Sequence, residues 1–162
     1  MIKIIGSLII IISGALIGKN LCNNIKNKIK FLEDFQKFVF YSKCEIEFKK
    51  TSPRNITENF ECNSVLKKFF KNLIYLIQNG ESFPGAWENT FKICKFDENK
   101  IILNFGKELG SYNLENQIET CNLALNNLSC VIKNLKQDID KNEKLFTYLG
   151  ACFGIIICII FF

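Results

Sequence analysis

The C-terminal third of the chain reads LENQIETCNLALNNLSCVIKNLKQDIDKNEKLFTYLGACFGIIICIIFF, residues 114–162. Its first part places apolar residues at the three- and four-residue spacing of one helix face: Leu114, Ile118, Cys121, Leu125, Leu128, Ile132, Leu135 and Ile139. Its last part, residues 145–162, carries no charge and is apolar on every side, which a soluble amphipathic helix would not be. No proline occurs, and no glycine precedes Gly150, so the stretch predicts one long helix that runs into a membrane span.

The N-terminal end has the same organisation in reverse. No charged residue occurs from Ile4 to Gly18, and an amphipathic pattern without proline or glycine follows as far as about Lys50. As helices, the two charge-free ends are about 22 and 27 Å long, slightly less than the roughly 30 Å of a hydrocarbon core. We therefore predict a transmembrane helix over 1–18, a helical domain over 19–144 and a second transmembrane helix over 145–162. A cleaved signal peptide is the rival interpretation of the first segment.

Lysines flank both apolar ends on the side of the middle domain: Lys19, Lys26, Lys28, Lys30, Lys133, Lys136, Lys141 and Lys144. Positively charged flanks stay in the cytoplasm, so the middle domain is expected there. The same lysines could also bind anionic lipid headgroups. The eight cysteines form no C-x-x-C pair, and in a reducing compartment we expect buried or lipid-facing thiols rather than disulfides.

The middle of the chain predicts several short helices, so the fold class is all-α, a cytoplasmic helical bundle between two transmembrane helices. Ser52 can cap a helix that begins with Pro53, and Ser82 can cap another. Asn63 or Ser64 opens a helix that Asn79-Gly80 ends. Asp97 precedes a further helix, which closes at Gly110, and Ser111 or Asn113 starts the last one.

The composition excludes several kinds of catalytic and metal site. The chain has no histidine, which removes Ser-His-Asp and Cys-His nucleophiles and His-ligated metals. Phe105-Gly106-Lys107-Glu108-Leu109-Gly110 lacks the spacing of a phosphate-binding loop. The net charge of +5 is modest, and basic residues alternate with acids, which is not typical of a nucleic-acid-binding protein. We expect no enzymatic activity, no cofactor and no nucleic-acid partner.

A few residues carry a second interpretation beside a purely structural one. Trp87, the only tryptophan, is either a core anchor or a partner contact, and Gly106 marks a close approach of two helices. The turn from Ser82 to Trp87 and the helix end at Gly110 are where a docked partner would be sought first. Small residues four apart on each predicted span could let helices pack closely: Gly14, Gly18, Gly150 and Gly154.

In order and spacing, these features resemble the stage III sporulation protein AB family of endospore-forming bacteria. The likeness covers nearly the whole chain. It rests on Gly14 and Gly18, Glu45-Ile46-Glu47-Phe48, Ser52-Pro53, Ala86-Trp87-Glu88, Phe105-Gly106-x-x-Leu109-Gly110 with Gln117, and Leu149-Gly150-Ala151-Cys152-Phe153-Gly154.

The resemblance implies a membrane protein of the mother cell, in a secretion-like complex that spans the two membranes around the forespore. The family's soluble domain is similar to that of the platform protein of type II secretion and type IV pilus systems. The expected partners are therefore the membrane, a cytoplasmic ATPase of the same complex and other membrane subunits, with a second copy of the chain left open. The alternative is a holin-like protein whose spans form a pore.

Overall fold

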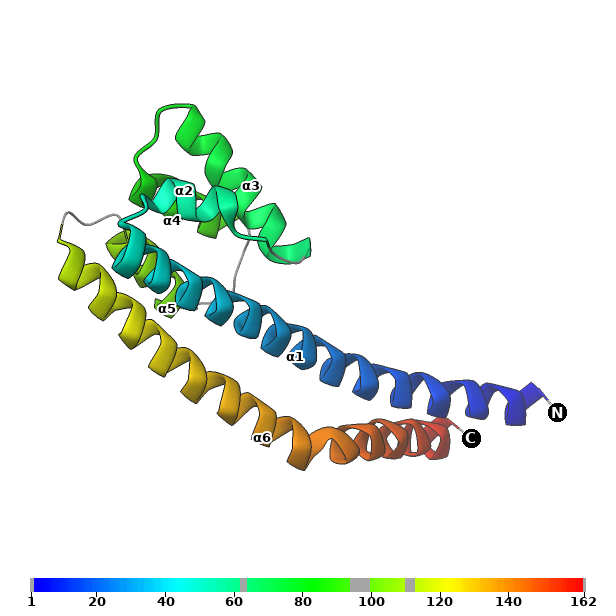
Figure 1. Ribbon diagram of the computed structural model, residues 1–162. Helices are drawn as coiled ribbons and strands as arrows, with labels where there is room; N and C mark the ends of the chain where they lie inside the picture. The colour runs from blue at the N-terminus through cyan, green and yellow to red at the C-terminus, as the bar shows by residue number, and fades with distance from the viewer. Residues whose placement is uncertain (1, 62–63, 94–99, 110–112, 162) are drawn as a thin grey trace. The chain divides into compact units, whose positions relative to one another are not determined.

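The computed structural model describes residues 2–61, 64–93, 100–109 and 113–161, and within these ranges the chain consists of helices and short connecting segments (Figure 1). The helices are α1 (Ile2–Lys49), α2 (Pro53–Asn59), α3 (Ser64–Gln78), α4 (Phe83–Ile93), α5 (Lys100–Glu108) and α6 (Leu114–Phe161). No strand occurs in the described ranges, so the predicted all-α class is confirmed.

The chain divides into two compact units. The terminal unit combines Met1–Lys30 with Ile132–Phe162, and the central unit comprises Phe31–Val131. These boundaries follow helix contacts, and both lie inside the domain predicted over 19–144, whose limits were drawn from charge.

Two long helices run through both units, as the sequence predicts. α1 and α6 each contain 48 residues without a break, so each continues from the central unit into an apolar end of the chain. α6 begins after Asn113, whose side-chain oxygen accepts a hydrogen bond from the backbone N–H of Glu115 at 3.0 Å. This contact satisfies one of the first amides of the helix, which have no partner within it.

The short helices begin and end where the local signals predict. Ser52 Oγ accepts a hydrogen bond from the amide of Asn55, and α2 begins with Pro53. Ser82 Oγ does the same for the amide of Gly85 at the start of α4. α3 ends at a turn in which Gly80 has φ of 94°, a conformation that glycine adopts without strain. The candidate caps Asn63 and Asp97 lie outside the described residues.

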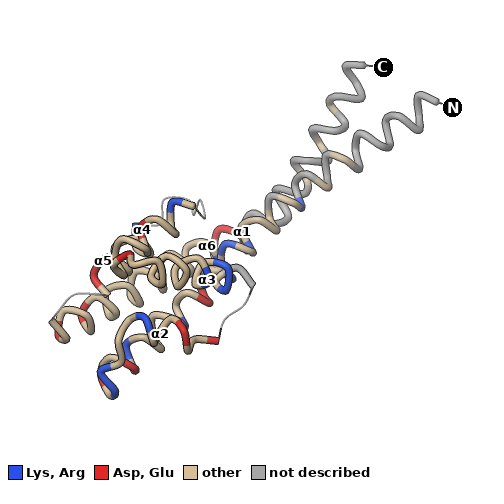
Figure 2. Tube along the Cα trace, turned by 90° about the horizontal axis from the view of Figure 1, so that it is seen from above, with Lys and Arg blue, Asp and Glu red and all other residues tan. Residues whose placement is uncertain are grey.

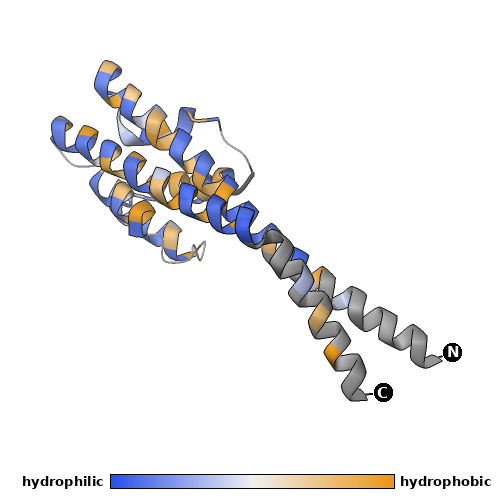
Figure 3. Ribbon diagram, turned by 90° about the horizontal axis from the view of Figure 1, so that it is seen from below, coloured by the Kyte–Doolittle hydropathy of each residue, from blue (hydrophilic) through white to orange (hydrophobic). Residues whose placement is uncertain are grey.

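The core of the central unit is an aromatic cluster to which four helices contribute. Its fully buried members are Phe35 and Phe38 of α1, Phe69 of α3, Trp87 of α4 and Phe105 of α5. Their ring centroids lie 4.9 to 6.3 Å apart in contacting pairs. Burying each such side chain stabilises the fold by about 2–3 kcal/mol. Apolar and polar residues alternate around these helices, which is the amphipathic pattern read from the sequence (Figure 3).

In the terminal unit, Cys22, Ile29, Ile132 and Ile139 are buried, whereas Leu16, Tyr148 and Ile156 are more than half exposed. Gly14, Gly18, Gly150 and Gly154 lie within α1 and α6, but the packing around them is outside the described side chains, so their predicted helix contacts stay predictions.

Among the described residues, no helix is both long enough and apolar enough to cross a membrane.

Candidate docking site at the α4–α5 junction

Trp87 stands at the centre of the region in which the sequence places a partner contact. Its side chain is 0% exposed, and its indole N–H donates a hydrogen bond of 3.0 Å to the backbone carbonyl of Ile102 on α5. The structure therefore supports the core-anchor interpretation. The ring has no exposed surface in this structure, and the predicted contact between Trp87 and a partner stays a prediction.

Gly106 is the residue that lets α4 and α5 approach each other. A Cβ atom built at Gly106 would overlap with atoms of the Trp87 indole, so no side chain fits between the helices. This confirms the prediction that Gly106 marks a close helix contact. The indole hydrogen bond and the bare backbone of Gly106 together fix the position of α5 on α4.

A group of charged side chains lies beside this contact, where α4 and α5 reach the surface. The carboxylate of Glu88 pairs with Nζ of Lys92 at 3.0 Å and with Nζ of Lys107 on α5 at 3.1 Å. A hydrogen bond from Lys92, which has the larger effect, and another from Lys107 hold the pKa of Glu88 below its usual range. All three side chains are at least a third exposed, so the group is available to a partner.

The turn before α4 is held by its own polar contacts. Besides the Ser82 cap, the side-chain amide of Asn89 donates to the carboxylate of Glu81 at 2.9 Å. These two bonds hold the turn before α4 against the helix. The other predicted contact, Gly110, lies outside the described residues.

The end of α1 is a second fixed junction. The Glu45 carboxylate accepts hydrogen bonds from Nζ of Lys49 at 2.6 Å and from Oγ1 of Thr51 at 2.9 Å. Lys50 has φ of 52°, and its amide and that of Thr51 donate to the carbonyls of Ile46 and Glu45, which is the pattern of a left-handed helix end. Glu45 thus ties the last turn of α1 to the start of α2.

A groove of about 220 Å³ lies between α5 and α6 within the central unit. Thr120 Oγ1 donates to the Glu108 carboxylate at 2.8 Å across it. The lining residues are Lys100, Ile101, Asn104, Phe105, Glu108, Thr120, Leu123, Ala124 and Asn127. Within the described part of the chain, no three side chains of His, Cys, Asp or Glu gather in a way that could hold a metal ion.

Comparison with known proteins identifies the family of the chain. The family described as stage III sporulation protein AB matches residues 3–162. The chain belongs to this family. No curated protein and no solved structure matches the chain. Membership of the stage III sporulation protein AB family makes this a stage III sporulation protein.

Several motifs that carry the family resemblance have structural roles here. The Ala86-Trp87-Glu88 and Phe105-Gly106 motifs meet at the α4–α5 contact. Glu45 accepts hydrogen bonds that hold the last turn of α1, which ends at Lys49. The sequence analysis does not predict the charged group of Glu88, Lys92 and Lys107 or the groove between α5 and α6. The four-residue spacing of Glu88 and Lys92 signals an ion pair, but Lys107 joins it only because Gly106 brings α5 beside α4.

Proposed function

We propose that this chain is a non-enzymatic membrane platform of a secretion-like complex in the mother-cell membrane around the forespore. Its helical domain would dock a cytoplasmic ATPase and contact other membrane subunits. The observation that carries the proposal is the family match over residues 3–162, since it spans both apolar ends and the helical middle. Fold-level analogy alone would be weaker support.

The two apolar ends support insertion into a membrane at 1–18 and 145–162. Residues 4–18 and 145–162 carry no charge, and lysines follow the first run and precede the second. Leu16 and Ile156 are 60% and 52% exposed, and large apolar side chains in such positions are favourable in lipid. In this arrangement the central unit is cytoplasmic.

The continuity of α1 and α6 supports a mechanical role. Each helix continues from an apolar end into the central unit without interruption, and an unbroken helix is stiff along its axis. A movement imposed on the central unit by an ATPase would therefore be transmitted to the membrane. This requires no chemistry from the platform itself.

The Glu88–Lys92–Lys107 group is our candidate for the ATPase-docking surface. It is exposed, it carries both signs of charge, and it rests on the rigid contact between Trp87 and Gly106. A surface on rigid elements can receive a force without yielding. Charged residues of both signs also occur on other helices of the central unit, so a matched control is needed (Figure 2).

Co-purification from sporulating cells tests the proposal. We expect the ATPase to co-purify with the full chain in mild detergent, and Glu88→Lys to reduce its recovery about fivefold or more. The control is Glu58→Lys, because Glu58 has the same 36% side-chain exposure and also pairs with a base four residues away in its helix. Absence of any ATPase from the wild-type sample would contradict the platform role. Equal recovery with the Glu88 and Glu58 variants would contradict only the docking surface.

Orientation is tested separately with a Glu81→Cys variant in intact cells. A thiol reagent that does not cross membranes should leave position 81 unmodified until the cells are permeabilised. Labelling of intact cells would place the central unit outside and contradict ATPase docking. Loss of membrane potential on overproduction would instead favour the holin-like alternative.

A further inference from the structure

One helix of the central unit differs from the others in its charge. α3 contains three lysines and no acidic residue, and Lys67, Lys68 and Lys71 are all exposed. None of the three has an ion-pair partner among the described residues, whereas α1, α2 and α4 each hold a Lys–acid or Arg–acid pair within the helix. Among the residues that the structure describes, no ion pair therefore neutralises the basic face of α3.

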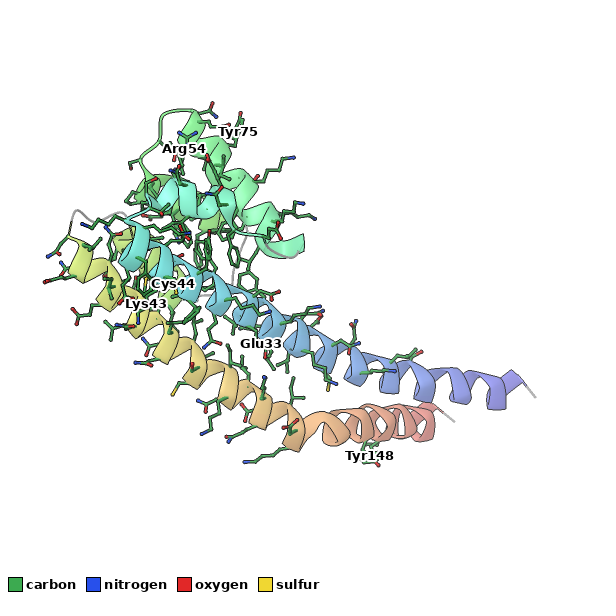
Figure 4. The ribbon with its side chains drawn as sticks, in the orientation of Figure 1. Glu33, Lys43, Cys44, Arg54, Tyr75 and Tyr148 are labelled. Carbon is green, nitrogen blue, oxygen red and sulfur yellow. The ribbon has the colours of Figure 1, made fainter. Side chains whose placement is uncertain are left out.

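The same face carries an exposed aromatic ring. Tyr75 is 64% exposed, and it continues the line of Lys67 and Lys71 at four-residue intervals. Residues at i, i+4 and i+8 form a ridge on a helix surface. Figure 4 shows Tyr75 on α3, directed away from the body of the central unit. We call Lys67, Lys71 and Tyr75 the α3 ridge.

A ridge of complementary character lies on α6. Glu115, Glu119 and Leu123 have the same i, i+4, i+8 spacing, and no basic residue occurs between Leu114 and Val131. All three are exposed, Leu123 by 56%. Leu123 also borders the groove between α5 and α6, whose apolar lining includes Phe105 and Ala124. We call Glu115, Glu119 and Leu123 the α6 ridge.

The two ridges belong to helices on opposite sides of α1 within the central unit. Phe38 of α1 contacts Phe70 of α3 with a centroid distance of 4.6 Å, whereas Gln36 of α1 donates to Ser129 of α6 at 2.7 Å. Residues two positions apart on a helix lie about 160° apart around its axis. Figure 1 shows the same separation. The α3 ridge therefore cannot reach the α6 ridge of its own chain.

We propose that the α3 ridge of one copy docks on the α6 ridge of a second copy. When the two helices run in the same direction and cross at about −50°, the ridges lie alongside each other. Lys67 then meets Glu115, Lys71 meets Glu119, and Tyr75 meets Leu123 at the mouth of the α5–α6 groove. Packing of two i, i+4 ridges is the commonest class of helix contact. Lys100 also lines the groove, where its ammonium can donate a hydrogen bond to the Tyr75 hydroxyl or to the Glu108 carboxylate.

The two contacting surfaces are different parts of the chain, so the contact is head-to-tail. Such contacts generate rings when the rotation between copies closes, and open arrays when it does not. The inference does not depend on ATPase docking, because the Glu88 group belongs to neither ridge. It assigns the central unit a role in assembling copies of the platform side by side.

Photo-crosslinking of the full chain in membranes tests this contact. p-Benzoylphenylalanine replaces Tyr75 in cells that produce two differently tagged copies, and the adduct is mapped by mass spectrometry. We expect an adduct that holds both tags and joins position 75 to the segment around Leu123. The control places the same amino acid at Phe48, which is 78% exposed on α1 and belongs to neither ridge.

Charge reversal then distinguishes this contact from any other. Lys71→Glu alone and Glu119→Lys alone should each reduce the adduct about fivefold to tenfold, because like charges would face each other. Mixing the two variants should restore it, since each copy then meets an opposite charge on both sides. Lys50→Glu is the control, and an unchanged Trp87 emission spectrum shows that the central unit is folded. Lys67→Glu with Glu115→Lys repeats the test at the second pair.

Three results would overturn the proposal. They are an adduct that lacks a second copy, an adduct mapped to another protein or to another part of the chain, and a failure of the mixed variants to restore it.

Discussion

The indole N–H of Trp87 and the backbone carbonyl of Ile102 are joined by a 3.0 Å hydrogen bond that spans fifteen residues of sequence. Both groups are buried, and the bond connects α4 to α5 inside the aromatic core. A phenyl or phenol ring would carry no N–H at this place. The contact therefore explains why position 87 holds a tryptophan rather than another large aromatic residue.

Trp87→Phe should lower the free energy of unfolding by about 2–3 kcal/mol, because it removes one buried hydrogen bond and leaves a small cavity. The measurement is chemical denaturation of the full chain in detergent, followed by far-UV circular dichroism. Phe48→Leu is the control, since Phe48 is 78% exposed and should change stability by less than about 0.5 kcal/mol. Equal stability of the Trp87 and Phe48 variants would show that the buried indole contributes nothing.

Gly106→Ala should destabilise the central unit by about 1–3 kcal/mol, because the added methyl group would overlap with the indole and force the helices apart. Trp87 emission should also change, since it is the only tryptophan. Gly85→Ala is the matched control, as its Cβ would approach only the Ser82 hydroxyl, at 3.1 Å. If the Gly106 variant is as stable as the Gly85 variant, α4 and α5 have room that the structure does not show.

The sequence predicts the helices well because their signals are local. The start of α2 at Pro53, the cap at Ser82 and the glycine turn at Gly80 each depend on residues within one helical turn. The unbroken length of α6 follows from the absence of proline and from its apolar spacing. These features need no knowledge of the tertiary fold.

The candidate site was harder to predict because it depends on contacts between distant residues. The spacing of residues could not show whether Trp87 faces the core or a partner. The packing of α5 against Trp87 shows that its ring lies in the core. Lys107 joins Glu88 for the same reason. The difference between the ridges of α3 and α6 is readable in the sequence, but their placement on opposite sides of α1 is not.

Cys121 should resist alkylation and make stability depend on alkaline pH. Burial raises the pKa of its thiol from an ordinary value of 9.0 to about 11. Because the folded pKa is the higher one, the folded state keeps the proton more tightly. The resulting stabilisation is complete below about pH 9 and is lost as the pH rises to about 11.

Two measurements check this behaviour. Iodoacetamide at pH 8 should modify the exposed Cys130 and leave Cys121 unmodified until denaturant is added. Cys121→Ala should show a smaller fall in unfolding free energy between pH 9 and 11 than the wild type. Rapid modification of Cys121 in the folded chain would contradict its burial.

Glu45 should make the α1–α2 junction sensitive to acid. A hydrogen bond from Lys49, which has the larger effect, and another from Thr51 lower the pKa of Glu45 below its usual value of 4.5. The stabilisation is therefore present above about pH 4.5 and is lost as the pH falls through the folded pKa. Glu45→Gln should flatten the acid side of a stability curve. Glu47→Gln, at an exposed carboxylate on the same turn, should leave that curve unchanged.

A break in α6 should separate membrane insertion from function. Inserting Gly-Gly after Asn142 would interrupt α6 between the central unit and the charge-free end, because two glycines greatly weaken a helix. If the platform transmits motion, the variant should reach the membrane in normal amounts and fail to support sporulation. The measurement is the frequency of heat-resistant spores, with membrane fractionation in parallel.

The same two residues inserted after Gly80, in the turn between α3 and α4, provide the control and should be tolerated better, since no helix is broken there. Sporulation at wild-type frequency with the Asn142 insertion would mean that the central unit and the membrane segments need no rigid connection, and the platform would then act by binding alone.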